Sequence, residues 1–141
     1  MIDVFEISKI PDFRGGVFNF IRNFNGLPRF VPLVTPGRMV GQGIGSRRHI
    51  QVVQTEGETV ETLEALDDTA RRLSFSVQVP SLRMHDYCAT IEVEDLTPDR
   101  CRVSWNCQFC PVDGDDEVKT VTFIKASYTG AMSCLADAVR T

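Results

Sequence analysis

The sequence predicts an α+β protein in which a curved antiparallel sheet wraps around one long C-terminal helix. Residues 46–110 contain five successive runs in which apolar and polar residues alternate, which is typical of strands with one buried face. Helical periodicity follows at about 115–139. An alternating run at residues 2–9 precedes two predicted short helices. Antiparallel sheets with one covered face belong to α+β proteins.

The N-terminal part is expected to form one strand and two short helices. Pro11 and Asp12 indicate a helix start, and apolar residues at helical spacing continue it to residue 24. Residues 27–34 are predicted to form a second short helix, interrupted by prolines. The glycines at 41, 43 and 45 predict a bent or bulged strand, because no helix follows them as a dinucleotide-binding loop would require.

Five strands are then expected near residues 46–54, 58–66, 71–79, 85–95 and 101–110. Turns are expected at Glu56-Gly57 and at 67–70, 80–84 and 96–100. Successive side chains of a strand point to opposite faces, so one parity of each strand faces the interior. The apolar residues of that parity are Ile50, Val52, Leu63, Ala65, Leu73, Phe75, Val77, Ala89, Ile91, Val93, Val103, Trp105, Cys107 and Phe109.

The long C-terminal helix is expected to pack on this face. Acidic residues at 115–117 and Arg140 at the other end match the helix macrodipole. Gly130 lowers helix stability by about 1 kcal/mol relative to alanine and predicts a close approach to the sheet. The apolar stripe consists of Val121, Ile124, Tyr128, Ala131, Leu135 and Val139.

A carboxylate and a phenol, Glu61 and Tyr87, share the interior parity. A buried carboxylate is costly unless something in the interior uses it. The predicted turns place Arg48 about four residues deeper than Glu61, and Tyr87 two strands or roughly 10 Å away. The predicted rows across the sheet are Val52, Glu61, Val77, Tyr87, Phe109; then Ile50, Leu63, Phe75, Ala89, Cys107; then Arg48, Ala65, Leu73, Ile91, Trp105.

Each polar interior residue has a functional and a structural interpretation. Glu61 could act as a general acid or base or accept a hydrogen bond from a ligand, or it could pair with a buried arginine or water. Tyr87 could donate to a ligand carbonyl or stabilise an enolate, or be a core tyrosine. Arg48 could hold a ligand carboxylate, or bind backbone carbonyls.

Composition limits the class of protein. A chain of 141 residues suits one domain, and its net charge of −4 without a basic block disfavours nucleic acid and anionic membrane as partners. We expect no signal peptide and no membrane-spanning segment. Five cysteines without a secretion signal predict reduced thiols in a cytoplasmic protein. Cys107 and Cys110 fall on opposite strand faces, so we expect neither a shared metal nor a disulfide.

Five segments together resemble a known superfamily: Arg22–Pro32, Gly45–Arg48, Glu61–Asp68, Leu73–Val77 and Asp86–Ala89. In this order they resemble the SRPBCC proteins, the START/Bet v 1-like helix-grip superfamily, and most closely its polyketide cyclase/dehydrase-like branch. The resemblance implies a seven-stranded sheet gripping the C-terminal helix around an apolar cavity. Residues 1–141 would form a single ligand-binding domain.

Plant abscisic-acid receptors are a more distant resemblance. The resemblance to these receptors implies that Glu61 and Tyr87 line the cavity and that Arg83-Met84 forms a latch. The ligand-binding lysine of the receptors is replaced by Pro28, and a helix asparagine by Gly130, so we do not expect abscisic-acid sensing. The expected ligand-binding residues are Arg48, Ile50, Val52, Glu61, Leu63, Phe75, Val77, Tyr87, Ala89, Trp105, Cys107, Ile124 and Tyr128, with a rim of Glu56, Gly57, Arg83, Met84 and His85.

Three functional hypotheses follow. The first is a binding protein for a small hydrophobic or aromatic, polyketide-like or lipid-like molecule, with apolar walls supplying affinity and polar residues orientation. The second is a cyclase- or dehydratase-type enzyme in which Glu61 and Tyr87 are catalytic, with no metal or nucleotide cofactor. The third is a ligand-gated interaction module whose rim meets a partner or, as a homodimer, a second copy of the chain.

Overall fold

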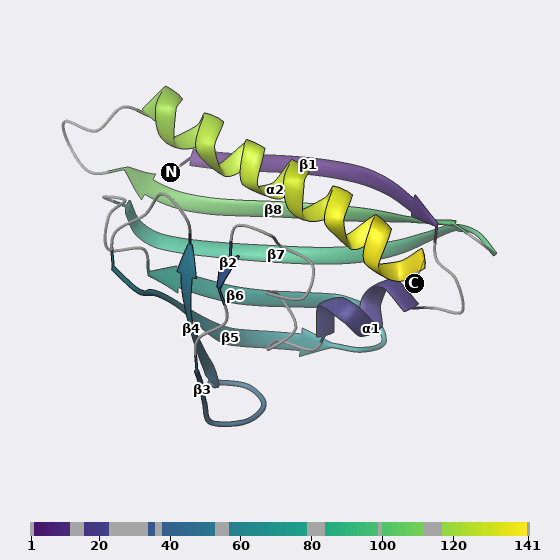
Figure 1. The fold of residues 1–141 in the computed structure, drawn as a ribbon, viewed down its shortest axis with the longest axis horizontal. Coiled ribbons are helices and arrows are strands. Elements are labelled where there is room, and N and C mark those ends of the chain that lie inside the picture. The colour runs from purple at the N-terminus through teal and green to yellow at the C-terminus, as the bar shows by residue number, and fades with distance from the viewer. Residues whose placement is uncertain are drawn as a thin grey trace.

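The computed structural model describes residues 2–11, 16–22, 34–35, 38–52, 57–78, 84–98, 100–111 and 117–140. In these residues an antiparallel sheet forms one curved layer and a long helix lies across its face (Figure 1). The α+β class and the C-terminal helix were predicted correctly. The six long strands are β1 (Ile2–Pro11), β4 (Arg47–Val52), β5 (Thr59–Asp67), β6 (Arg72–Gln78), β7 (Met84–Thr97) and β8 (Arg100–Pro111).

The sheet order is β1-β8-β7-β6-β5-β4-β2, and the first strand therefore pairs with the last. Two strands of two residues each, β2 (Val34–Thr35) and β3 (Met39–Val40), both pair with β4. One short helix, α1 (Gly16–Arg22), is described after β1. The second predicted helix falls mainly on residues outside the described ranges, and Val34 lies in a strand. Seven strands and two helices after β1 are therefore not confirmed.

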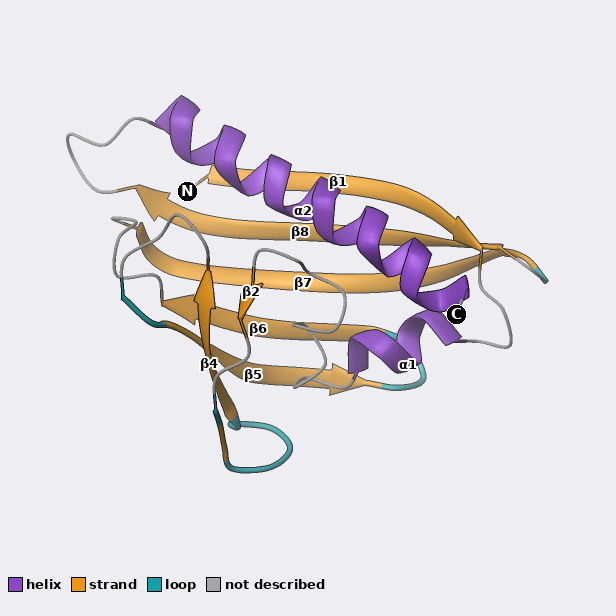
Figure 2. Cartoon of the chain, in the orientation of Figure 1, coloured by secondary structure: helices purple, strands orange, loops and turns teal. Residues whose placement is uncertain are grey.

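The long helix α2 (Glu117–Arg140) supplies the second layer of the core. It contacts β1, β8 and α1, while α1 contacts β7 (Figures 1 and 2). The predicted stripe is buried at Ile124, Tyr128, Ala131 and Leu135, and Met132 is an additional buried residue. The predicted close approach at Gly130 is wrong, because this glycine is exposed and a Cβ atom there would meet nothing within 4 Å. No described helix has both the length and the apolar character needed to cross a bilayer.

The interior face of the sheet matches the predicted parity with one exception. Ala65 is exposed because a β-bulge between Leu63 and Ala65 shifts the register, so that Leu66 rather than Ala65 pairs with Leu73. Val77 is half-buried, and the side chain of Val52 lies outside the described part of the chain. The buried members of the face are Ile50, Leu63, Leu73, Phe75, Ala89, Ile91, Val93, Val103, Trp105, Cys107 and Phe109.

The register between β4 and β5 differs from the prediction. Glu61 pairs with Arg48, not with Val52, and Ile50 pairs with Thr59, not with Leu63. The connection is therefore longer than a tight turn at Glu56-Gly57, and Arg48 lies level with Glu61 instead of deeper in the sheet. This correction brings the two charged groups of the interior face together.

Elsewhere the predicted rows hold over most of their length. Glu61 pairs with Val77, as predicted. The pairings Phe75–Ala89–Cys107 and Leu73–Ile91–Trp105 are also present. The β6–β7 ladder ends at Cys88, so it does not include Tyr87, the residue that precedes Cys88 in the sequence. The pairing of β7 with β8 is irregular between His85 and Cys88, where Asp86 has φ of 54°. Tyr87 therefore lies at a kink and not in the regular row that was predicted.

The glycines at 41, 43 and 45 form a turn, not the bent strand that was predicted. Their φ angles are 85°, 68° and 89°, in the left-handed region that glycine adopts without steric cost. The turn joins β3 to β4 and extends away from the rest of the sheet (Figure 1).

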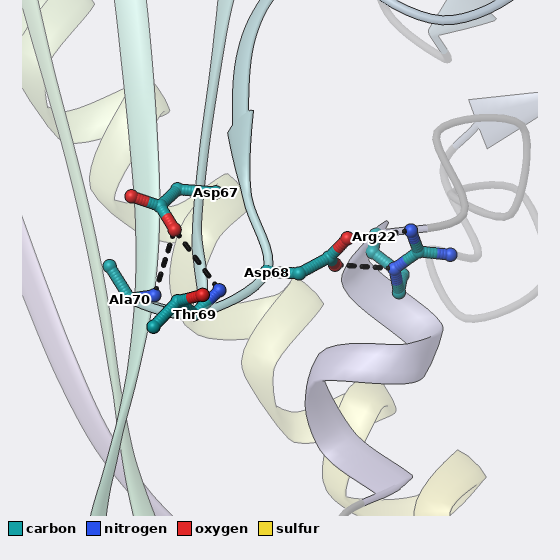
Figure 3. A network of polar contacts seen from close by, with 5 residues as sticks. All are labelled: Arg22, Asp67, Asp68, Thr69 and Ala70. Atoms are coloured by element: carbon teal, nitrogen blue, oxygen red, sulfur yellow. Dashed lines mark hydrogen bonds and ion pairs between the residues drawn. The ribbon is translucent and has the colours of Figure 1, made fainter.

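A polar network ties α1 to the β5–β6 turn (Figure 3). Arg22 donates two hydrogen bonds to Asp68, from Nε to Oδ1 over 2.8 Å and from Nη2 to Oδ2 over 3.1 Å. The guanidinium holds the pKa of the Asp68 carboxyl below its usual value. Asp67 Oδ1 accepts hydrogen bonds from the backbone N–H groups of Thr69 and Ala70, which confirms the turn predicted at residues 67–70.

Candidate functional site

A buried ion pair lies at the β4–β5 end of the interior face. Arg48 Nε donates a hydrogen bond of 2.7 Å to Glu61 Oε1. The guanidinium carbon of Arg48 lies 5.5 Å from the centroid of the Phe75 ring, a cation–π distance. The two residues are only 5% and 6% exposed, so neither charge is solvated by bulk water. Of the two structural interpretations of Glu61, the arginine partner is the one that the structure contains.

Two further buried polar residues flank this ion pair. Thr59 lies two positions before Glu61 on the same face of β5, and Ser46 immediately precedes β4. Both are 3% exposed. Within the described residues, Thr59 Oγ1 has no hydrogen-bond partner. Thr59 was not predicted as a site residue from the sequence, although its parity with Glu61 on the same strand was a signal for it.

A pair of tyrosines joins the sheet to α2. The hydroxyl oxygens of Tyr87 and Tyr128 are 2.7 Å apart, a hydrogen bond between residues 41 positions apart in sequence. Tyr87 stacks on Phe109 with ring centroids 6.2 Å apart, and Tyr128 stacks on Trp105 at 4.5 Å and 15°. These contacts fix both phenol rings, so the hydroxyls have defined positions in an otherwise apolar layer.

Both phenols are strongly biased towards their neutral form. Burial raises the pKa of Tyr87 well above its usual value, and the nearby Cys107 thiol and the Glu61 carboxylate raise it further. Burial likewise raises the pKa of Tyr128, with Tyr87 and Cys107 adding to the effect. One neutral phenol can donate to the other, and the accepting phenol then still has a proton of its own to donate. The pair therefore provides a hydrogen-bond donor suited to a carbonyl oxygen.

The structure brings most of the predicted ligand-binding residues onto one interior surface. Tyr87 and Val77 are half-buried. Gly57 is exposed, with φ of 80°. Glu56 and Arg83 lie outside the described residues, as do the side chains of Val52, Met84 and His85, so the rim stays a prediction. The buried members are Arg48, Ile50, Glu61, Leu63, Phe75, Ala89, Trp105, Cys107, Ile124 and Tyr128.

Solved structures share this fold over nearly the whole chain. XoxI from Bacillus cereus is 23% identical with a TM-score of 0.85, covering 99% of this chain and 96% of its own. The Zhui aromatase/cyclase from Streptomyces sp. R1128 is 11% identical with a TM-score of 0.80, covering 99% and 93%. Norcoclaurine synthase from Thalictrum flavum, in complex with dopamine and hydroxybenzaldehyde, is 16% identical with a TM-score of 0.72, covering 98% and 83%.

The chain matches a family model in sequence, although no curated protein matches it. The model for polyketide cyclase / dehydrase and lipid transport proteins matches residues 16–140, which include α1, β2–β8 and α2. The structural neighbours have the Bet v 1-like helix-grip fold that the sequence resemblance implied. The chain therefore belongs to the polyketide cyclase/dehydrase and lipid transport family of the SRPBCC superfamily.

Proposed function

We propose that this protein binds a small apolar or aromatic molecule between the interior face of its sheet and α2. The observation that carries the proposal is the Tyr87–Tyr128 hydrogen bond, which places two neutral hydroxyl groups between the two layers. Aromatic rings surround it, since Phe109 and Trp105 stack on the two phenols. A polar group of this kind among apolar walls is the usual arrangement of a small-molecule site.

The family and the shared fold support a molecule of this kind. The family description names polyketide cyclases, dehydrases and lipid transport, and lipids are largely apolar. A structural neighbour was solved with dopamine and hydroxybenzaldehyde, which are small aromatic compounds. We propose that residues 1–141 act as one such START-like domain in the cytoplasm.

The two polar features would divide the work of orienting the ligand. The tyrosine pair would donate to an oxygen atom of the ligand. The Arg48–Glu61 pair would bind a second polar group, such as a hydroxyl that donates to the carboxylate. The apolar residues between them, among them Phe75 and Ala89, would supply most of the affinity through burial.

A cyclase- or dehydratase-type enzyme is the second candidate function. What favours it is that both Glu61 and Tyr87 lie in the interior, where the Glu61 carboxylate adds to the burial that raises the pKa of the Tyr87 phenol. In such an enzyme Glu61 would accept a proton from the carbon next to a ligand carbonyl, while Tyr87 would donate a hydrogen bond to the developing enolate oxygen. Protonation of Glu61 would weaken its ion pair with Arg48, and this cost makes binding the leading proposal.

The test is binding and turnover of aromatic ketones by three proteins. Native mass spectrometry should show one ketone molecule per wild-type chain. Glu61→Gln should weaken binding under the binding proposal, because an amide oxygen accepts a hydrogen bond less strongly than a carboxylate does, and it should also abolish turnover if the protein is an enzyme. The control is Glu64→Gln, because Glu64 lies on the exposed face of the same strand and hydrogen-bonds Ser76. Absence of saturable binding by the wild type would overturn the proposal.

A further inference from the structure

Trp105 has a buried hydrogen-bond donor that has no partner among the described residues. It is the single tryptophan of the chain, lies in the middle of β8 and is 6% exposed. Across the described ranges, no acceptor lies within hydrogen-bond distance of its Nε1 atom. A buried indole N–H usually has a partner, because water is lost on burial and nothing else compensates for it.

The hydroxyl of the ring that stacks on the indole is already paired with another phenol. The Tyr128 ring covers one face of the indole, and its hydroxyl is bonded to Tyr87. The backbone of Trp105 pairs with Glu6 of β1 and with Ile91 of β7 as part of the regular sheet. The indole N–H lies in the plane of its ring, so an acceptor can approach the ring edge without displacing the stacked Tyr128.

The electrostatic surroundings select the kind of acceptor. Burial raises the pKa values of Tyr128, which stacks on Trp105, and of its partner Tyr87, so both phenols are neutral. Arg48 lies on β4, with β5, β6 and β7 between it and β8, and it is paired with Glu61. Arg48 is the only buried cation among the described residues, so a carboxylate placed at Trp105 would have no buried cation of that set beside it, whereas a neutral carbonyl oxygen carries no charge to compensate.

We infer that the molecule bound in the interior has a neutral carbonyl oxygen that accepts a hydrogen bond from Trp105 Nε1. The ligand class is accordingly aromatic or conjugated ketones and related neutral carbonyl compounds, not plain hydrocarbons and not carboxylic acids. This inference rests on the proposed binding function and narrows its substrate class.

Two ligands of matched shape test the inference: 2-acetylnaphthalene and 2-isopropenylnaphthalene, in which a methylene group replaces the carbonyl oxygen. The chain has one tryptophan, so its indole N–H gives one resonance in a proton–nitrogen correlation spectrum. The ketone should move this proton resonance downfield, and the alkene should not. The ketone should also bind about tenfold more tightly, the effect of one hydrogen bond to a buried donor.

The variant Trp105→Phe removes the donor and retains an aromatic ring. The ratio of its affinities for the ketone and the alkene should fall several-fold towards one. A change in packing that weakens both ligands equally leaves this ratio unchanged. An equal effect of both ligands on the wild-type indole resonance would overturn the inference, as would an unchanged ratio in the variant. If both ligands bind equally, only this inference fails. If neither ligand binds, the proposed function fails with it. The wild-type spectrum decides the matter even if the variant does not fold.

Discussion

Arg48 Nε donates a 2.7 Å hydrogen bond to Glu61 Oε1, and both residues are buried on the interior face of the sheet. They are directly opposite each other on β4 and β5. The interior thus has a charged end at β4 and β5 and a neutral, donor-rich end where Tyr87, Trp105 and Tyr128 meet. A ligand that reached both ends would meet two different kinds of polar partner.

Removing one member of the ion pair should destabilise the fold strongly. Arg48→Met leaves a buried carboxylate unpaired, and we expect a loss of about 3–5 kcal/mol in the free energy of unfolding. The double variant Arg48→Met/Glu61→Leu should recover most of this loss, because no charge then stays buried. Urea denaturation measures both, with Arg47→Met, at an exposed neighbouring position, as the control. A loss below about 1 kcal/mol for Arg48→Met would show that the pair is solvated.

The two tyrosines should resist ionisation as long as the protein is folded. They are the only tyrosines of the chain, and burial raises the pKa values of both. Because the folded pKa values exceed the unfolded value of about 10, their contribution to stability is complete below pH 10 and decreases as the pH rises above it. Near-ultraviolet absorbance should show tyrosinate only together with unfolding. Reversible titration near pH 10 with the fold intact would contradict the buried pair.

The hydrogen bond between the phenols should appear as a coupling energy. Tyr87→Phe and Tyr128→Phe should each destabilise the protein, and the double variant by less than their sum, with a coupling of about 1 kcal/mol. The reason is that each single variant leaves the other hydroxyl without its partner. Chemical denaturation of the four proteins gives the coupling. Strict additivity would mean that the two hydroxyls do not interact.

The Arg22–Asp68 ion pair should lower the pH at which the Asp68 carboxyl titrates. Because the pKa of this carboxyl is lower in the folded protein than in the unfolded chain, the pair stabilises the fold above the ordinary aspartate pKa. That contribution is lost as the pH falls through the folded pKa. Carboxyl-carbon chemical shifts should give a midpoint for Asp68 below about 3.9, the ordinary value, and a higher midpoint in Arg22→Gln. The same midpoint in both proteins would mean that the contact is absent in solution.

The alternation of apolar residues was sufficient to predict the six long strands and most of the interior face, but not the two-residue strands β2 and β3. It placed Phe75, Ala89 and Cys107 in one row, as observed. It failed where the chain departs from period two. The bulge after Leu63 exposes Ala65, and a bulge has no reliable signature in a single sequence. The register of Arg48 with Glu61 depends on the length of the connection between β4 and β5, which alternation does not determine.

The polar residues of the site were predictable individually, but their partners were not. Glu61 and Tyr87 stand out because they interrupt an apolar parity. The partner of Tyr87 is Tyr128, which lies on the helix and not on the sheet, so hairpin geometry could not place it. The unpaired Nε1 of Trp105 is likewise a three-dimensional property, because it depends on every neighbouring acceptor in the fold.

The most direct test of the interior site is to locate bound 2-acetylnaphthalene by intermolecular nuclear Overhauser effects. We predict effects from ligand protons to the ring protons of Tyr87, Trp105 and Tyr128, at one ligand per chain. Effects confined to surface residues such as Ile44 and Val118, which are 60% and 77% exposed, would instead contradict an interior site.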